Sequence, residues 1–247
     1  MTLLVDVGNT RLKWARVYGS DLTERGDALY PKASMSQVLE TCWSSLMRPY
    51  RVLVCNVAGP VIAEALSTWI LRRWDCPVDF VTARSAGWGV TTAYQDPASL
   101  GADRWATLVA AHRKFPPPVC IVDCGTAITV DVLAAGGLHL GGLILPGLTL
   151  MRRSLYRRTD ALPEVSSGRL SLRARNTNDG IAAGTFYAAV ALVDRVVADT
   201  EAALDAQVTC VVCGGDARLF APHFTRSATC EPDLVLLGMA IMAETAA

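Results

Sequence analysis

Short apolar runs alternate with longer segments of helical periodicity in the first part of the chain. A short apolar run that ends in turn residues is typical of a buried strand, whereas apolar residues three or four positions apart indicate a helix. On this basis we predict strands at 3–7, 12–16, 52–57 and 78–81, and helices at 35–46, 60–73 and 103–114. The run Pro116-Pro117-Pro118 then ends the last of these helices, because proline lacks an N–H donor.

The second part of the chain shows the same mixture. We predict strands at 119–122, 128–133, 138–140, 143–145 and 208–213, and helices at 148–156, 179–204 and 234–244. The polar and weakly periodic stretch 157–177 predicts a surface loop. Buried strands interleaved with helices predict an α/β fold.

The two parts begin with the same motif. Val5-Asp6-Val7-Gly8-Asn9-Thr10 and Val122-Asp123-Cys124-Gly125-Thr126-Ala127 each place an Asp, one apolar residue, a Gly and polar residues at the end of an apolar strand. An Asp there can hold a cation, and a Gly lets backbone N–H groups approach phosphate oxygens. A single copy is more often an ordinary hairpin turn. Two copies at matching positions favour two duplicated halves that grip a nucleoside triphosphate from both sides.

Length and charge narrow the picture further. The chain has 247 residues, enough for one large domain or two small ones, and the repeat favours two halves, 1–115 and 119–247. Lys plus Arg and Asp plus Glu each number 23, so no net charge attracts nucleic acid or an anionic membrane. No uncharged apolar run is long enough to span a membrane. The eight cysteines lie mostly in apolar runs and the N-terminus lacks a secretion signal, which favours a reducing cytoplasm.

Other polar motifs are ambiguous when taken singly. Gly101-Ala102-Asp103-Arg104 at a helix start could combine a proton acceptor with an anion clamp, although a capping role for Asp103 is the commoner use. Gly214-Gly215-Asp216-Ala217 suits either adenine or ribose binding or a strand-to-helix turn. Cys210-x-x-Cys213 has no second cysteine pair at zinc spacing, so a metal or redox role is disfavoured. A Walker loop is excluded, because Leu148 stands where its lysine belongs.

Taken together, the motifs resemble those of the type III pantothenate kinases, in the superfamily of acetate kinase, sugar kinases, Hsc70 and actin. The matching segments cover residues 6 to 217 in family order: Asp6-Val7-Gly8-Asn9-Thr10-Arg11-Leu12-Lys13, Gly101-Ala102-Asp103-Arg104, Asp123-Cys124-Gly125-Thr126-Ala127-Ile128-Thr129, Gly141-Gly142-Leu143-Ile144-Leu145-Pro146-Gly147, Asn176-Thr177 and Gly214-Gly215-Asp216-Ala217. The resemblance implies two ribonuclease H-like halves, of the actin-like ATPase kind, around a central cleft. One departure is Gly180, where the family pattern has Ala, which leaves the helix start there open.

The resemblance also implies an activity and its residues. The activity is ATP-dependent phosphorylation of pantothenate to 4'-phosphopantothenate, the first step of coenzyme A biosynthesis. The catalytic proton acceptor is Asp103, and substrate-binding residues are Tyr94, Gly101, Ala102, Asp103, Arg104 and Thr177. The ATP-binding residues are Asp6, Val7, Gly8, Asn9, Thr10, Arg11, Leu12, Lys13 and Thr126.

Cations and a partner follow from the same resemblance. Asp6 would lie near Mg²⁺, and Asp123 would hold a monovalent cation, either potassium or ammonium. The family is dimeric, with the substrate site near the interface between subunits.

Two other functions remain open from the sequence. A non-catalytic relative could serve in regulation, as members resembling this family have been assigned to transcriptional activation. The presence of Asp6, Asp103 and Asp123 favours the enzyme. A kinase of the same superfamily that acts on a sugar or on acetate is disfavoured by the Gly101-Ala102-Asp103-Arg104 match.

Overall fold

The computed structural model describes residues 1–19, 21–31 and 34–244. The chain forms two compact units. The first contains residues 1–114, the short segment 136–139 and helix α7 (Leu234–Glu244), and the second contains residues 115–135 and 140–232. The units therefore differ from simple halves at 1–115 and 119–247 in two places, because the 136–139 segment and α7 pack with the first unit.

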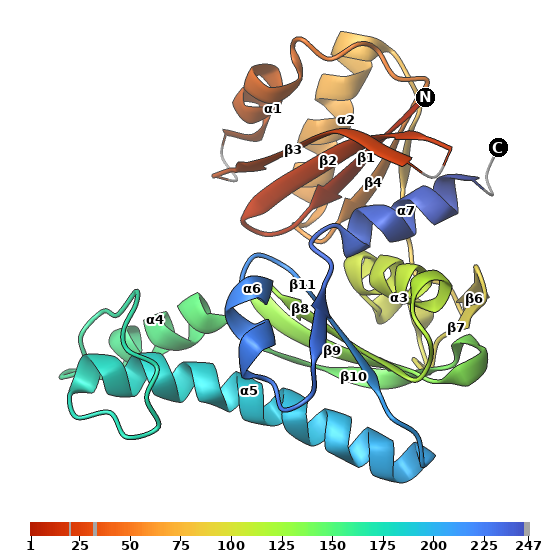
Figure 1. Ribbon diagram of the computed structural model, residues 1–247. Helices are drawn as coiled ribbons and strands as arrows, with labels where there is room; N and C mark the ends of the chain where they lie inside the picture. The colour runs from red at the N-terminus through yellow and green to blue at the C-terminus, as the bar shows by residue number, and fades with distance from the viewer. Residues whose placement is uncertain (20, 32–33, 245–247) are drawn as a thin grey trace. The chain divides into compact units, whose positions relative to one another are not determined.

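The first unit is a five-stranded sheet with helices on both faces (Figure 1). Its strands lie in the order β3 (Asp21–Leu29), β2 (Arg11–Tyr18), β1 (Thr2–Val7), β4 (Arg51–Asn56) and β5 (Val78–Phe80). Strand β1 is antiparallel to β2 and parallel to β4. One face is covered by α1 (Met35–Trp43) and α2 (Pro60–Trp74), and the other by α3 (Ala102–Lys114) and α7. A small hairpin of β6 (Ala86–Gly87) and β7 (Val90–Thr91), followed by the 3-10 turn η2 (Pro97–Ser99), leads to α3.

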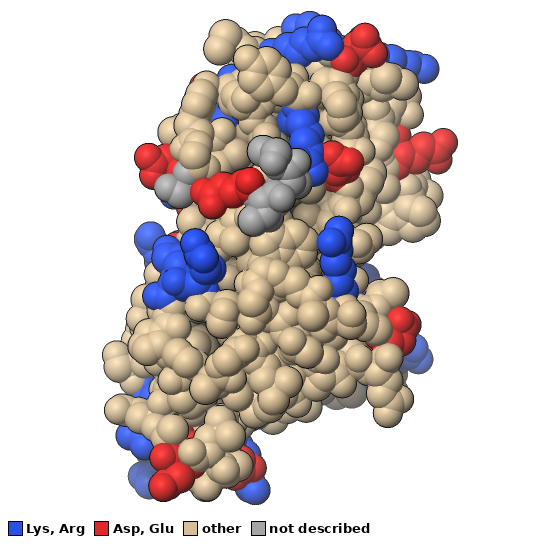
Figure 2. Space-filling model, turned by 90° about the vertical axis from the view of Figure 1, so that its right-hand side faces the viewer, with Lys and Arg blue, Asp and Glu red and all other residues tan. Residues whose placement is uncertain are grey.

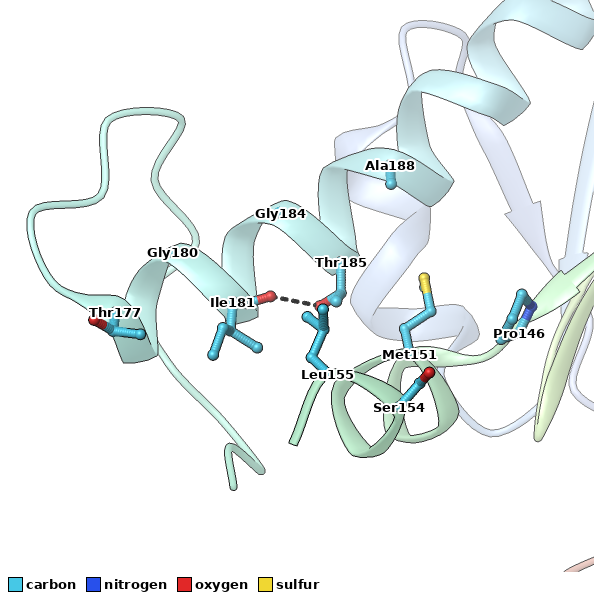
Figure 3. A pocket seen from close by; sticks show the side chains of 10 residues that line it. All are labelled: Pro146, Met151, Ser154, Leu155, Thr177, Gly180, Ile181, Gly184, Thr185 and Ala188. Carbon is cyan, nitrogen blue, oxygen red and sulfur yellow. Dashed lines mark hydrogen bonds between the residues drawn. The ribbon is translucent and has the colours of Figure 1, made fainter. Parts of the chain in front are cut away.

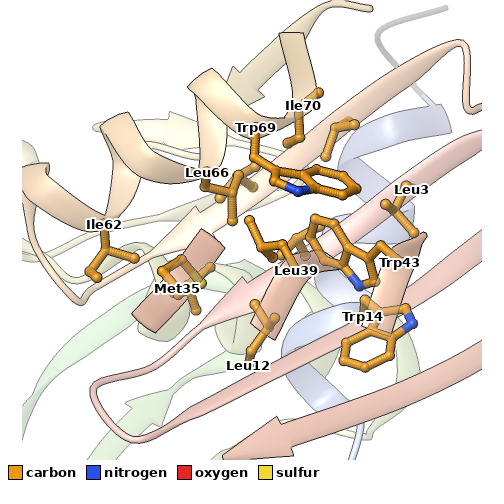
Figure 4. Close-up of a cluster of buried hydrophobic side chains, with 14 of the residues drawn as sticks. Leu3, Leu12, Trp14, Met35, Leu39, Trp43, Ile62, Leu66, Trp69 and Ile70 are labelled. Carbon is orange, nitrogen blue, oxygen red and sulfur yellow. The ribbon is translucent and has the colours of Figure 1, made fainter. Parts of the chain in front are cut away.

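The core between the sheet and α1 and α2 is rich in tryptophan (Figure 4). Trp43 is fully buried, and its ring centroid lies 5.9, 5.8 and 5.7 Å from those of Trp14, Trp69 and Trp74. Alternate residues of β1 contribute to this core, because successive side chains of a strand point to opposite faces. The residues between them, Asp6 included, face α3 and α7 instead.

The second unit repeats the sheet of the first. Its order is β10 (His139–Pro146), β9 (Ala127–Leu133), β8 (Val119–Cys124), β11 (Thr209–Cys213) and β12 (Ala228–Cys230), with β8 antiparallel to β9 and parallel to β11. Its helices are α4 (Leu148–Arg158), α5 (Thr177–Leu204) and α6 (Ala217–Phe220), followed by the 3-10 turn η4 (Ala221–His223). The 3-10 turn η3 (Ala135–Gly137) lies where the chain passes from the second unit into the 136–139 segment of the first. The matching strand orders confirm the prediction of an α/β fold with duplicated halves.

Helix α5 is long and apolar enough to cross a membrane by length and composition alone, and half of its most apolar window is buried. Its buried residues Phe186, Val190, Val193 and Val197 pack against the sheet of the second unit. The helix is thus part of a protein core. On the face drawn in Figure 2, basic and acidic side chains are both present and uncharged residues cover most of the surface, in keeping with the balanced composition.

Local differences from the predicted elements have physical causes. Strand β3 was not predicted, because only one of its side chains is buried and its sequence is polar. Strand β10 is continuous, whereas the sequence suggested two strands separated by Gly141 and Gly142. Gly141 adopts a φ of 112°, so the strand passes through a conformation that favours glycine without breaking. Helix α5 begins at Thr177, two residues before the predicted start.

Candidate active site

The β1–β2 hairpin of the first unit carries the polar motif at its tip. The N–H of Gly8 donates to the carbonyl oxygen of Arg11 at 3.0 Å, which closes the turn around Asn9 and Thr10. Both tip side chains are exposed. Asp6 lies directly opposite Lys13 in the antiparallel pair, so the two side chains share the sheet face that α3 and α7 cover. Arg11 forms an ion pair with Asp27 of the edge strand β3, which links β2 to β3 through side chains.

Tyr30 holds this tip in place from the far end of β3. Its hydroxyl donates to the carbonyl oxygen of Gly8, and its backbone N–H donates to that of Thr10 at 3.2 Å. Burial raises the pKa of the Tyr30 phenol, and the negative charge of Asp6 raises it further. The phenol therefore stays protonated and able to donate over a wide pH range. No sequence pattern pointed to this residue, because a single aromatic residue after an unpredicted strand forms no recognisable motif.

The start of α3 arranges the Gly101-Ala102-Asp103-Arg104 motif. The carboxylate Oδ1 of Asp103 accepts the backbone N–H of Arg104 at 2.7 Å, and the carbonyl oxygen of Gly101 accepts that of Trp105 at 2.9 Å. A Cβ on Gly101 would lie only 2.5 Å from Asp103 Oδ1. Residue 101 must therefore be glycine for the Asp103 carboxylate to adopt this position.

Arg104 is buried and is engaged by Tyr94. Its Nη1 donates to the Tyr94 hydroxyl at 2.7 Å, and its guanidinium carbon lies 5.4 Å from the centre of the tyrosine ring. This pair combines a charge-assisted hydrogen bond with a cation–π contact. The structure thus brings together Tyr94, Gly101, Asp103 and Arg104, which the sequence assigned to one substrate site.

Two further side chains contact Tyr94. His139, fully buried, has its ring 5.8 Å from that of Tyr94 in a stacked arrangement, and its Nδ1 lies 3.1 Å from Thr92 Oγ1. Thr92 Oγ1 also accepts the backbone N–H of Tyr94 at 3.2 Å. Neither residue belongs to a motif that can be recognised in the sequence. The only signal was a histidine within the apolar run around 138–140.

In the second unit, three turns meet at the end of β8. The N–H of Gly125 donates to Ala127 O at 3.0 Å, and the N–H of Gly147, the N-cap of α4, donates to Thr126 O at 2.9 Å. A Cβ on Gly147 would lie 2.2 Å from Gly125 O, so only glycine fits between these backbones. Asp123 is half-buried, opposite Thr129 and on the sheet face away from α5.

The third turn follows β11. Gly214 has a φ of 87°, and a Cβ there would lie 2.4 Å from Asp123 Oδ1 and 2.5 Å from Cys124 O. The N–H of Asp216 donates to Cys124 O at 3.0 Å. The turn at 123–126 and the Gly214-Gly215-Asp216 turn are far apart in the sequence, yet they form one polar cluster at the ends of the central strand β8 and its neighbour β11.

Arg152 is close enough to this cluster for its positive charge to act on Asp216. Its guanidinium donates to Thr185 Oγ1 at 3.2 Å and to Ser166 O at 2.6 Å, which ties α4 to α5 and to the loop before α5. Burial raises the pKa of Asp216, whereas the positive charge of Arg152 lowers it. The neighbouring Arg153 is exposed, but Arg152 is buried.

Thr177 is the first residue of α5 and is exposed. Asn176 is the N-cap, and its side chain accepts the backbone N–H of Asp179 at 2.9 Å. The N–H of Gly180 donates to Asn176 O at 2.9 Å, and a Cβ on Gly180 would meet no atom within 4 Å. The helix therefore starts regularly through Gly180, and the departure from the family pattern leaves its geometry intact.

Between α4 and α5 lies an open pocket of about 610 Å³ (Figure 3). Its lining is mainly apolar and small: Pro146, Met151, Ser154, Leu155, Thr177, Gly180, Ile181, Gly184, Thr185 and Ala188. Thr177 stands at one end and Pro146 at the other. The pocket thus joins two of the sequence motifs, at 146–147 and 176–177.

The carboxylates suit a hard cation bound together with a substrate. Among the described residues there is no group of three or more His, Cys, Asp or Glu side chains that could enclose a metal ion. Asp6 and Asp123 each stand on the central strand of their own sheet. Mg²⁺ is commonly held by one or two carboxylates together with substrate phosphates and water, and such a site needs no protein cage.

Solved structures of other proteins have a similar fold. MreB5 of Spiroplasma citri, solved with ADP bound, is similar in fold, with a TM-score of 0.53 at 12% identity over 99% of this chain and 96% of that one. A Baf family protein of Campylobacter jejuni has a TM-score of 0.65 at 23% identity over 99% of this chain and 98% of that one. The duplicated five-stranded sheets define the actin-like ATPase fold.

The particular family follows from sequence similarity. The model of the type III pantothenate kinase family matches residues 2–199. A type III pantothenate kinase of Nitrosococcus oceani is 42% identical over 99% of this chain and 94% of that protein. The chain belongs to the type III pantothenate kinase family, as its motifs predict.

Proposed function

We propose that this chain transfers the γ-phosphoryl group of ATP to the primary hydroxyl of pantothenate, which gives 4'-phosphopantothenate and ADP in the first step of coenzyme A biosynthesis. One observation carries the proposal. At the start of α3, a carboxylate, a buried guanidinium and a tyrosine hydroxyl are assembled by hydrogen bonds of 2.7 Å. This set offers a base for a hydroxyl and a cation for a carboxylate, and pantothenate carries both groups.

Asp103 is the proposed proton acceptor. In the transfer, the hydroxyl oxygen forms a bond to the γ-phosphorus, the bond from that phosphorus to the bridging oxygen breaks, and ADP leaves with the bond's electrons. The hydroxyl proton passes to the Asp103 carboxylate. Its hydrogen bond from the N–H of Arg104 fixes the carboxylate before substrate arrives, which matters more than an unusual pKa in a reaction governed by positioning.

Arg104 is the proposed partner of the pantothenate carboxylate. A guanidinium already fixed by the Tyr94 hydroxyl loses less entropy on binding a carboxylate than a mobile one. Gly101, Ala102 and Tyr94 would complete the wall of this site. Thr177, exposed at the start of α5, is also assigned to pantothenate.

The hairpin tip is the proposed phosphate-binding element. Residues Asp6 to Lys13 combine backbone N–H groups at a tight turn with one carboxylate and one ammonium group across the strand pair. Asp6 would hold Mg²⁺ together with the ATP phosphates. Bound Mg²⁺ supplies positive charge that stabilises the negative charge developing on the transferring and leaving oxygens.

The cluster in the second unit is the proposed site for a monovalent cation and part of the nucleotide. Asp123 would bind potassium or ammonium, and Thr126 would contact the nucleotide. The close approach of Gly214 to Asp123 supports this assignment, because the missing Cβ leaves the carboxylate oxygen accessible to a small ligand.

We further propose that the chain acts as a cytoplasmic homodimer with its substrate site near the interface. The apolar pocket between α4 and α5, with Thr177 at its end, supports a second copy as its occupant, since apolar hollows of this kind are typical of protein interfaces. Sedimentation velocity should show a dimer. Full activity of a monomer at nanomolar concentration would contradict the shared site.

The central experiment follows ADP release by the purified chain with Mg²⁺, ATP and pantothenate, in potassium and in sodium. We expect pantothenate-dependent turnover that is faster in potassium. Asp103→Asn should lower kcat by about 10² or more, the usual effect of losing a positioned base. Asp96→Asn is a matched control, because Asp96 caps η2 by accepting the N–H of Ala98 and lies outside the proposed site.

The outcomes separate this proposal from its alternatives. Turnover with acetate or a hexose in place of pantothenate would assign a different acceptor. The absence of turnover with every acceptor would favour a non-catalytic relative. Near-normal kcat in Asp103→Asn would remove Asp103 from the role of base.

A further inference from the structure

Tyr94 lies at the centre of a set of contacts that extends beyond the motifs. On one side it binds Arg104, through the 2.7 Å hydrogen bond to its hydroxyl and the 5.4 Å approach of the guanidinium to its ring. It also stacks with His139 at 5.8 Å and an interplanar angle of 22°. The position of the Arg104 guanidinium thus depends on Tyr94, and Tyr94 is packed against His139.

Thr92 links His139 to Tyr94. Its Oγ1 lies 3.1 Å from His139 Nδ1 and accepts the backbone N–H of Tyr94 at 3.2 Å. His139 therefore holds Tyr94 in two ways. Its ring stacks directly on the tyrosine ring, and its Nδ1 contacts the threonine hydroxyl that accepts the N–H of Tyr94. The aromatic ring and the backbone of Tyr94 are both fixed.

The backbone that carries His139 is itself tightly held. Gly137 has a φ of 77°, and a Cβ there would lie 1.8 Å from Gly89 O, so the two backbones touch. Leu138 forms a parallel bridge with Thr91. The segment 136–139 thus docks on the loop that leads to Tyr94, and it delivers a histidine with no exposed surface. This docking explains why the segment belongs to the first unit.

We infer that His139 is a positioning residue for pantothenate binding: it holds Tyr94, and through Tyr94 it holds the Arg104 guanidinium that receives the substrate carboxylate. The inference rests on the proposed function. It adds a residue that acts on acceptor affinity, since its ring stacks on Tyr94 and its Nδ1 lies against Thr92 Oγ1, both on the acceptor side of the site. A purely structural histidine would instead support the fold with no preference for one substrate.

The test compares the KM values for the two substrates. His139→Leu removes the stacked ring and the bond to Thr92 at similar volume. We expect the KM for pantothenate to rise about tenfold, equivalent to about 1.4 kcal/mol, with the KM for ATP and kcat within about twofold of the wild type. Thr92→Val should raise the pantothenate KM in the same direction. It serves as the second variant if His139→Leu does not fold.

A double-mutant cycle tests the route through Tyr94. In a Tyr94→Ala background, His139→Leu should change the pantothenate KM by less than about twofold, because the residue it acts through is gone. His112→Ala is the matched control. The His112 ring lies against the same docked backbone, where a Cβ on Gly89 would be 2.5 Å from its Nε2, and this variant should leave both KM values unchanged.

The possible results point in distinct directions. An unchanged pantothenate KM in His139→Leu overturns the inference alone, provided that the wild type turns over pantothenate. An equal rise in both KM values, or the same rise in His112→Ala, also overturns it by showing general loosening. Failure of the wild type to turn over pantothenate overturns the proposed function and this inference with it.

Discussion

Adding one methyl group at Gly101 should displace the proposed base without unfolding the protein. A Cβ at this position would lie 2.5 Å from Asp103 Oδ1, and the shortest ordinary contact is 3.4 Å, so the carboxylate must retreat by about 0.9 Å. The φ of Gly101 lies outside the left-handed region, so alanine suits the backbone. Gly101→Ala therefore acts mainly on the Asp103 side chain.

The expected magnitudes for activity and stability differ. A misplacement of about 1 Å at a reacting group costs about 10²-fold in rate, or about 2.7 kcal/mol. The lost hydrogen bond from the N–H of Arg104 costs about 0.5–1.5 kcal/mol of stability. Replacing Gly by Ala stabilises the folded state by about 0.4–1 kcal/mol, because it restricts the conformations of the unfolded chain. We therefore expect kcat to fall about 10²-fold, as in Asp103→Asn, while the Tm changes by only a few degrees.

The assay is steady-state ADP release together with thermal unfolding followed by circular dichroism. Gly87→Ala is the control within the same unit, because its Cβ would meet Trp105 at an ordinary 3.6 Å. In an Asp103→Asn background, Gly101→Ala should cause no further loss of kcat. A Gly101→Ala enzyme with kcat within about threefold of wild type would refute the link between the position of Asp103 and the chemistry.

Three further changes test other parts of the molecule. Tyr30→Phe removes the hydrogen bond to Gly8 O, so the KM for ATP should rise about fivefold. Because burial raises the pKa of Tyr30 above its ordinary 10.0, the stability that its neutral form contributes is complete below pH 10 and lost as pH rises further. The stability advantage of wild type over Tyr30→Phe in urea titrations should therefore shrink above pH 10, and a constant difference would contradict this. Trp43→Ala should lower the free energy of unfolding, measured in urea titrations, by about 3–5 kcal/mol. Trp43→Phe should lower it much less, because the indole N–H that this change removes is buried and has no partner among the described residues. Gly214→Ala, with a φ of 87° and a Cβ 2.5 Å from Cys124 O, should weaken nucleotide binding at least tenfold in a calorimetric titration, and unaltered affinity would exclude this turn from the site.

Strand alternation explains why the repeated Asp motifs could be placed from the sequence. In Val5-Asp6-Val7, the two valines enter the core beneath α1 and α2, so the intervening Asp must face the other way. The same holds for Val122-Asp123-Cys124, whose flanking residues pack toward α5. The alternation of side chains along a strand and the local turn motif were sufficient to predict where these Asp residues lie, because both depend only on neighbouring residues.

The contacts of His139 and Arg152 could not be found in this way. His139 reaches Tyr94 only because the 136–139 segment packs with the first unit, although the strands before and after it belong to the second. Arg152 stands in a basic stretch of α4 together with Arg153, Arg157 and Arg158, yet α5 and the loop at Ser166 cover it. Long-range packing decides both cases, and periodicity carries no information about it.

Asp103 is the second residue of α3 and not its N-cap, but its carboxylate still accepts a hydrogen bond in the first helical turn, so support of the helix start and the role of catalytic base are compatible in this geometry. The hydrogen bond from the N–H of Arg104 satisfies a donor of the first helical turn and at the same time fixes the carboxylate. Asparagine at 103 can accept the same bond, because its side-chain oxygen replaces the carboxylate oxygen, but it cannot take up the substrate proton. Asp103→Asn should therefore keep the helix start and lose the chemistry, whereas Asp103→Ala should lose both. The difference in unfolding free energy between the two variants, about 1 kcal/mol, measures the hydrogen bond at the helix start separately from the base.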